Sequence, residues 1–280
     1  MLKKLLPTRF NKDVPFVPVV RREGALINGQ GGFGRQNLNL QAVAGPLRKA
    51  FSMKRAECVA ICINSPGGSP TQSRYIHDRI RQLADENDKK VVEFTEDVAA
   101  SGGYWLACAG DEIVADAASI VGSIGVIAAG FGFTGLIEKL GVERRVYTAG
   151  QNKLTLDPFQ PEKEVDVDYL KSLQLDIHAQ FIDHVKTRRG DRLADDDTLF
   201  TGRFWTGAKA KELGLVDALG DLRGTMVERY GKKVQLKLIG QRRGGLLRGI
   251  FSAKVEGAGG PIIHALDTFN ERAMMSRYGL

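Results

Sequence analysis

The sequence predicts an α/β fold with a largely parallel β-sheet and flanking helices, and two observations carry this prediction. Apolar runs of strand length alternate with segments of helical length along most of the 280 residues, an order typical of parallel strands joined by helices. The chain is also 43% hydrophobic, which is enough to bury one sizeable core. Because no internal repeat divides it, we expect a single copy of this core.

The elements can be placed in order from the pattern of apolar residues. The run Val59-Ala60-Ile61-Cys62-Ile63 is apolar throughout, as expected of a strand buried on both faces. Strands are expected at 16–20, 25–28, 58–63, 90–94, 113–115, 124–128 and 144–147. Helices are expected at 38–52, 71–86, 102–109, 133–140, 165–189 and 207–213.

A serine set among small residues is the first candidate for chemistry. Ser101 lies in the run Ala100-Ser101-Gly102-Gly103, and Lys153 follows 52 positions later (153 minus 101). A serine hydroxyl becomes a nucleophile when a neighbouring base takes its proton, and a lysine amine can do so where burial keeps it neutral. The four histidines are scattered without an acidic partner at a recognisable spacing, so the sequence does not indicate a Ser/His/Asp triad. The alternative is an ordinary glycine-rich turn and a surface lysine.

A second motif favours the catalytic interpretation. The buried strand at 59–63 runs directly into Asn64-Ser65-Pro66-Gly67-Gly68-Ser69-Pro70. Adjacent glycines can adopt positive φ and point their N–H groups at a developing oxyanion. The N–H of Gly102, next to the candidate nucleophile, would be the second donor, and a helix beginning there would add a field that favours negative charge.

These motifs, with two more, resemble those of the signal peptide peptidase A (protease IV) family of serine peptidases. The resemblance covers roughly residues 17–219 and rests on Lys153 and on the segments 63–68, 100–104 and 121–126 in this order. It implies a Clp protease/crotonase-like fold and a Ser/Lys dyad. It further implies that short members such as this chain form homo-oligomeric rings, in which the serine and the lysine can come from adjacent subunits.

Five site residues follow from the resemblance. Ser101 matches the nucleophile, Lys153 the general base, Gly68 and Gly102 the donors of the oxyanion hole, and Ser123 a hydroxyl that orients the lysine amine. Ser123 also has a physical rationale, because a hydroxyl that accepts one N–H bond of a neutral amine can hold its lone pair toward the nucleophile. The expected reaction is hydrolysis of peptide bonds through an acyl-enzyme, on apolar peptides such as remnant signal peptides.

Two other functions stay open at this point. A crotonase-type acyl-CoA enzyme would use the same paired backbone donors for an enolate, but would normally need an acidic base near the glycine loop. A non-catalytic scaffold at the membrane is the second alternative. Thioester turnover would reveal the first, and failure of Ser101 to react with a serine-directed label would favour the second.

The distribution of charge separates the ends of the chain from its middle. The net charge is +7, whereas residues 1–22 alone carry +5 (six bases minus one acid) and residues 241–255 carry +4 (four bases, no acid). We therefore divide the chain into a basic N-terminal segment (1–22), a peptidase domain (23–240) and a basic, partly helical C-terminal tail (241–280). The near-neutral domain argues against a nucleic-acid partner, while the basic ends fit either weak contact with an anionic membrane surface or two solvated tails.

No cofactor or metal is expected. Cys58, Cys62 and Cys108 lie within apolar runs, as buried, reduced thiols would, and no metal-ligand spacing appears. The segment 29–34 matches Gly-x-Gly-x-x-Gly, but no acid follows where a dinucleotide site needs it. The uncharged stretch between Asp116 and Glu138 is rich in glycine and is expected to be strand and loop. We expect a cytoplasmic protein, with peripheral contact at the inner membrane face as an option.

Overall fold

A single β-sheet organises the described part of the chain. The computed structural model describes residues 14–29, 37–240 and 273–279. Its strands are β1 (Phe16–Glu23), β2 (Val59–Ser65), β3 (Val91–Ala100), β4 (Glu112–Ala115), β5 (Ile120–Gly122), β6 (Phe204–Thr206), β7 (Ala218–Leu219) and β8 (Gln235–Leu238).

The sheet is parallel except at one edge. Its main order is β6-β5-β3-β2-β1-β8, and only the pairing of β5 with β6 is antiparallel among the described strands. The long strand β3 pairs with β4 along its first half and with β5 at its end, and β4 in turn pairs with β7. This confirms the predicted α/β fold with a largely parallel sheet, in keeping with the Clp protease/crotonase-like architecture.

Helices cover both faces of the sheet. One face packs against α1 (Leu40–Phe51), α2 (Pro70–Asn87), α3 (Gly102–Ala107), α6 (Gly207–Glu212) and the second half of α5 (Glu164–Arg189). The other face packs against α7 (Leu222–Tyr230). Side chains of β2 alternate between the two cores, with Ile61 and Ile63 on one side and Ala60 and Cys62 on the other. A central strand buried on both faces explains the unbroken apolar run.

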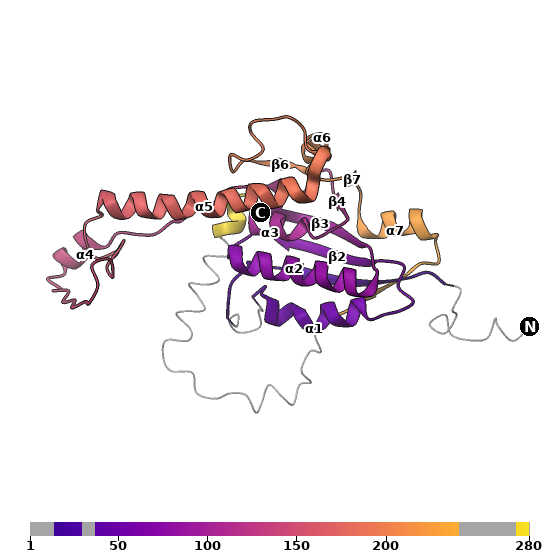
Figure 1. Cartoon of the computed structure of the whole chain (residues 1–280), viewed down its shortest axis with the longest axis horizontal. Coiled ribbons are helices and arrows are strands. Elements are labelled where there is room, and N and C mark those ends of the chain that lie inside the picture. The colour runs from indigo at the N-terminus through magenta and orange to yellow at the C-terminus, as the bar shows by residue number, and fades with distance from the viewer. Residues whose placement is uncertain (1–13, 30–36, 241–272, 280) are drawn as a thin grey trace, which may run out of the picture.

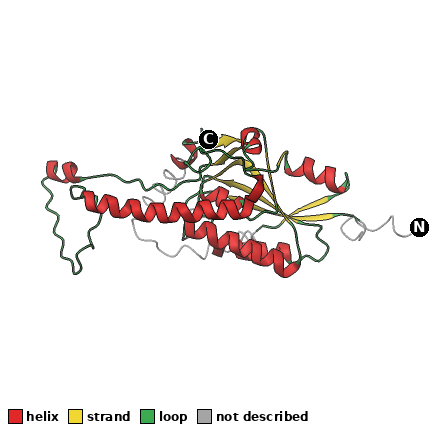
Figure 2. Ribbon diagram, turned by 45° about the horizontal axis from the view of Figure 1, so that its top comes forward, coloured by secondary structure: helices red, strands yellow, loops and turns green. Residues whose placement is uncertain are grey.

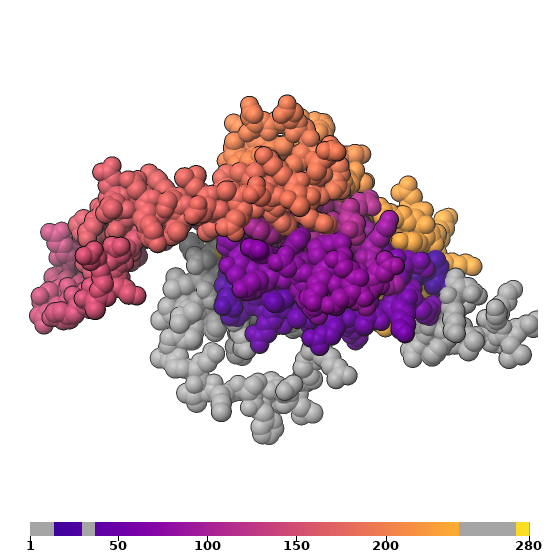
Figure 3. Space-filling view, viewed as in Figure 1, coloured from indigo at the N-terminus to yellow at the C-terminus, as the bar shows by residue number. Residues whose placement is uncertain are grey.

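One region projects from this body. Residues 127–175, here called the arm, comprise a loop, α4 (Thr134–Lys139), a second loop and the first half of α5 (Figures 1 and 3). The C-terminal end of α5 is fixed to the body, because Arg189 donates to both carboxylate oxygens of Asp217, each at 2.9 Å. A short 3-10 helix (Gly190–Arg192) follows it. The second half of α5 therefore connects the arm to the body.

Several expected elements differ from the structure. All six predicted helices are present, but the strands expected at 124–128 and 144–147 are wrong, since the first is loop and the second lies in the exposed arm. The strand at 25–28 is reduced to isolated bridges at Leu26, whose N–H and carbonyl bond to the loop after β2. The short strands β5, β6, β7 and β8 were not predicted, because runs of two to four residues gain their strand character from pairing partners. Helix α7 was also not predicted.

The uncharged stretch after Asp116 contains β5, loop and part of α4, so its interpretation as strand and loop holds apart from the short helix. Within the described ranges, no helix is both long and apolar enough to cross a membrane. Most of the segment 29–34 and of both basic ends lies outside these ranges.

Candidate active site

Ser101 occupies a strained turn between β3 and α3. Its backbone has φ 52° and ψ −124°, a conformation that costs a residue with a side chain on the order of 1–3 kcal/mol. The turn is held because the Ser101 N–H donates to the Gly122 carbonyl at 2.8 Å, while the Ser101 carbonyl accepts from the N–H groups of Tyr104 and Trp105. The Ser101 side chain makes no capping bond to the helix. Its hydroxyl is thus free to face the cavity beside it.

The glycine loop after β2 packs directly on this turn. Gly67 and Gly68 have φ of 102° and 136°. A Cβ atom on Gly67 would lie 2.7 Å from the Ser101 Cβ, and one on Gly68 would lie 2.3 Å from the Leu26 carbonyl oxygen. Only glycine fits at either position, because both the space and the φ angle exclude a side chain.

Two backbone N–H groups beside Ser101 have no partner among the described residues. A Cβ atom on Gly102 would lie 3.4 Å from the Gly68 nitrogen, so the two glycines are neighbours. Neither the Gly68 N–H nor the Gly102 N–H donates a hydrogen bond to any described residue. Paired, unused N–H donors next to a serine hydroxyl are the arrangement that stabilises an oxyanion.

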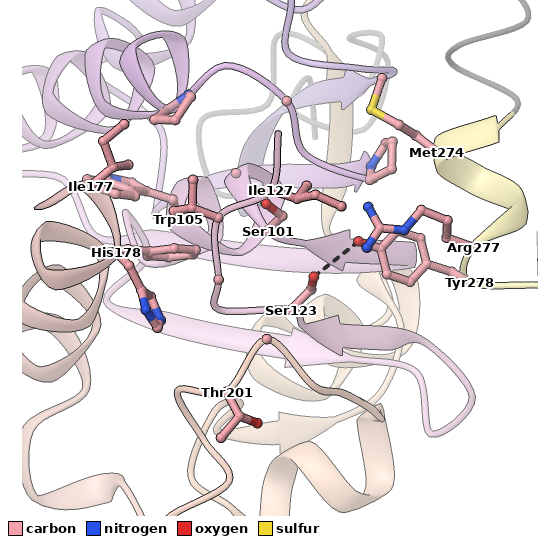
Figure 4. A pocket seen from close by; sticks show the side chains of 18 residues that line it. Ser101, Trp105, Ser123, Ile127, Ile177, His178, Thr201, Met274, Arg277 and Tyr278 are labelled. Carbon is pink, nitrogen blue, oxygen red and sulfur yellow. Dashed lines mark hydrogen bonds between the residues drawn. The ribbon is translucent and has the colours of Figure 1, made fainter. Parts of the chain in front are cut away.

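Ser123 faces the same cavity from the turn after β5. It has φ 54°, is 8% exposed, and its N–H donates to the Arg203 carbonyl at 2.7 Å. The Ser123 hydroxyl accepts a hydrogen bond from the Tyr278 hydroxyl at 3.3 Å (Figure 4). Nothing in the sequence indicated this partner, because 155 residues separate the two and the tail carries no motif.

The cavity has a volume of about 520 Å³. Ser101, Ser123, Gly68 and Gly102 all line it, so the structure brings together four of the five predicted site residues. None of the described residues that line the cavity is acidic. The acyl-CoA alternative, which needs an acidic base near the glycine loop, therefore lacks that group in this cavity.

Lys153, the fifth predicted residue, is not in the cavity of its own chain. It lies in an exposed turn of the arm, where its backbone N–H donates to the Gly150 carbonyl at 3.4 Å. The arm extends away from the body in both ribbon views (Figures 1 and 2). Within one chain, the lysine and Ser101 are thus held apart by α5.

The described histidines do not supply a base for Ser101. His178 lines the cavity, but its Nε2 pairs with the Ile124 carbonyl oxygen at 3.1 Å and so supports the Ser123 turn. His77 and His184 pack edge to face, with ring centroids 4.3 Å apart. Burial, followed by the neighbouring His77, lowers the pKa of His184 to about 3. Burial likewise lowers the pKa of His77, so both rings stay neutral in the folded protein at pH 7.

The three cysteines are free and buried, as expected. Burial raises the pKa of the Cys62 and Cys108 thiols to about 12, so they are poor nucleophiles at neutral pH. No group of three His, Cys, Asp or Glu side chains within the described ranges could hold a metal ion.

Comparisons with known proteins agree with this geometry. The sequence profile of peptidase family S49 matches residues 84–237. A putative signal peptide peptidase SppA from Enterococcus faecium is 31% identical over 188 residues, which cover 67% of this chain and 54% of that protein. A putative protease from Synechocystis is 33% identical over 211 residues, covering 74% and 73%.

A second group of relatives is much longer. Two Brucella proteins, each named Na(+)/H(+) antiporter NhaA, are 55% and 54% identical over 291 aligned positions. The alignment covers the whole of this chain but 39% of each Brucella protein. The chain thus spans about two fifths of the length of these relatives.

Proposed function

Because the chain belongs to peptidase family S49, we propose that it is a serine peptidase with a Ser101/Lys153 dyad that works through an acyl-enzyme. The Ser101 oxygen attacks the scissile carbonyl carbon as a lysine amine takes the hydroxyl proton, and the Gly68 and Gly102 N–H groups hold the oxyanion. The lysine then delivers its proton to the leaving amine as the peptide C–N bond breaks. A water molecule then gives a proton to the same amine and attacks the acyl carbon. The ester bond to Ser101 breaks, and the lysine returns the proton to the Ser101 oxygen.

The observation that carries this proposal is the pair of unused N–H groups beside a strained serine. A serine in an ordinary turn would not need φ 52° or two glycines that no other residue can replace. Preformed donors cost no reorganisation when charge develops, which makes them effective in the transition state.

The base, in this proposal, comes from a second copy of the chain. Lys153 sits on an arm that extends away from its own Ser101. The arm carries ten of the exposed large hydrophobic side chains of the described residues, namely Ile127, Phe131, Leu136, Leu140, Val142, Tyr147, Val165, Tyr169, Leu173 and Leu175. Apolar surface of this extent favours contact with another protein surface. A ring of identical chains would cover it and bring each lysine to a neighbour's Ser101 and Ser123.

The substrates, we further propose, are extended apolar peptides such as remnant signal peptides. Trp105 and Phe181 stack with ring centroids 4.9 Å apart, and both line the cavity with Ile127 and Ile177. Such a wall suits apolar side chains. We place this activity in the cytoplasm, with weak contact at the inner membrane face, where the basic residues of the two ends would be attracted to anionic lipid.

A mixing experiment tests the dyad and its division between chains. Ser101→Ala and Lys153→Ala chains, each inactive alone, are dissociated, mixed in equal amounts and reassembled, and cleavage of an apolar fluorogenic peptide is measured. If serine and lysine come from different copies, about one quarter of the sites in the mixture contain both intact groups, so activity returns. Activity that stays absent after mixing, although the unmutated chain is active, would mean that the dyad forms within one chain.

A further inference from the structure

Residues 273–279, here called the cap, lie against the candidate active site although they are remote from it in sequence. Met274, Arg277 and Tyr278 line the same cavity as Ser101 (Figure 4). Residues 273–276 are helical, and the following turn is closed by the Tyr278 N–H, which donates to the Met275 carbonyl at 2.9 Å. The cap therefore has its own local structure at the cavity wall.

Tyr278 anchors the cap through both ends of its side chain. Its ring packs on Val98 and Ala100 of β3 and meets the Phe204 ring edge to face, with centroids 5.0 Å apart. Its hydroxyl donates to the Ser123 hydroxyl in a buried bond of 3.3 Å. With 9% of the residue exposed, Tyr278 fills a pocket that is apolar at its walls and polar at its end.

The polar end of this pocket is the Ser123 hydroxyl, the group expected to orient the lysine amine. Ser123 can orient a neutral amine only if that amine comes within hydrogen-bond distance of its oxygen. In the capped structure the Tyr278 hydroxyl takes that place, and Arg277 adds a positive charge to the cavity that an incoming lysine must enter. Tyr278 and the lysine would thus compete for one hydroxyl.

We propose that residues 273–279 form an inhibitory cap, anchored by Tyr278 on Ser123, that must leave before the lysine of a neighbouring chain can reach Ser123. The inhibitory effect of the cap rests on the proposed function, whereas the contact between Tyr278 and Ser123 is independent of it. Among the described residues, one side-chain hydrogen bond and the packing of Tyr278 and Met275 join the cap to the body, so displacement by a substrate or by a neighbouring arm requires the loss of few interactions.

The position of the cap is tested without any peptidase activity. In the full chain, Ser123→Cys places a thiol under Tyr278, and its rate of reaction with a maleimide is measured. The native cysteines are buried and give the background rate in the unmutated chain. Adding Tyr278→Ala should raise the labelling rate tenfold or more, whereas adding Tyr75→Ala, which removes an exposed tyrosine of α2, should leave it unchanged. A synthetic peptide with the sequence of residues 273–280 should slow the labelling again.

The effect on the reaction is measured with Ser123 intact. Tyr278→Phe keeps the ring and removes the bond to Ser123, so kcat/KM for an apolar peptide should rise several-fold, and Tyr278→Ala should raise it further. Labelling rates that agree within twofold with and without Tyr278 would overturn the cap, as would a fall in kcat/KM in both variants. Faster labelling with no peptide cleavage by any variant would uphold the cap over Ser123 and reject the proposed function instead.

Discussion

The body and the arm of this protein differ in what holds them together. In the body, the strands β2 and β3 are buried on both faces, and many of their side chains have no exposed surface. In the arm, ten large apolar side chains are exposed, although Phe133 packs against Phe159 and Arg144 bonds to Asp157 at 2.9 Å. The body thus encloses its core, whereas the arm has an apolar surface that no other described residue covers. The nucleophile and oxyanion donors belong to the first region, and the proposed base to the second.

The largest expected effect is the loss of turnover when the proposed catalytic residue of either the body or the arm is replaced. Ser101→Ala and Lys153→Ala should each lower kcat by about 10³-fold or more, because the two groups act as one unit. Thermal unfolding should separate the regions, since Lys153 is exposed and its replacement should leave Tm unchanged. Lys139→Ala, in α4 of the same arm, is the matched control and should keep both activity and Tm. Peptide cleavage that survives in Lys153→Ala would remove the arm from the mechanism.

Charge on the apolar surface of the arm should break the assembly without unfolding the chain. Leu175 is 67% exposed on α5, so Leu175→Asp should change the unfolding free energy by no more than about 0.5 kcal/mol. It should nevertheless shift the protein to a smaller species in light scattering and lower turnover. Tyr75→Asp, an exposed position of the body, should do neither. An unchanged particle mass for Leu175→Asp would show that this part of the arm is not an interface.

Glycines with positive φ should report the difference in packing between the two regions. Gly68→Ala places a methyl group 2.3 Å from the Leu26 oxygen at φ 136°, and should cost about 2–5 kcal/mol from overpacking and backbone strain together. Gly141, in the arm, has φ 63° and no atom within 4 Å of the added carbon, so Gly141→Ala should cost about 1 kcal/mol. Chemical denaturation measures both. Equal costs would contradict the tight packing of the glycine loop.

The last expected effect is on the pH dependence of stability, which is absent at neutral pH and develops only on acidification. Because burial lowers the pKa of His184 to about 3, its stabilising contribution is present above the unfolded value near 6.5 and is lost as pH falls toward 3. The slope per proton is at most about 1.4 kcal/mol per pH unit. His184→Phe should flatten this loss in urea midpoints measured between pH 7 and 4, whereas Tyr75→Phe should not. If His184→Phe left the pH dependence of the unfolding free energy unchanged, another group would be responsible for the loss of stability at low pH.

Local patterns in the sequence were sufficient for the elements that depend on near neighbours. The apolar run of β2 and the motif around Ser101 predicted a strand, a glycine loop and a helix, because sheet burial and positive φ restrict which residues fit locally. Strand β5, by contrast, has three residues and was not predicted, since its pairing with β3 and β6 fixes its position, and the strand expected just after it at 124–128 is loop. Pairing between distant segments leaves little trace in a short sequence window.

The sequence by itself determined the fold class and, through its motifs and their family resemblance, four of the residues that meet at the cavity, Ser101, Ser123, Gly68 and Gly102. It could do so because a strand buried on both faces and a turn that only glycine allows can each be recognised from a few adjacent positions. Tertiary structure alone decided that Lys153 stands on an arm away from its own Ser101, and that Tyr278 donates to Ser123 across 155 residues. These relations depend on how far a helix extends and on which distant segments share a pocket. Such contacts arise from the packing of the whole chain, which no local pattern records.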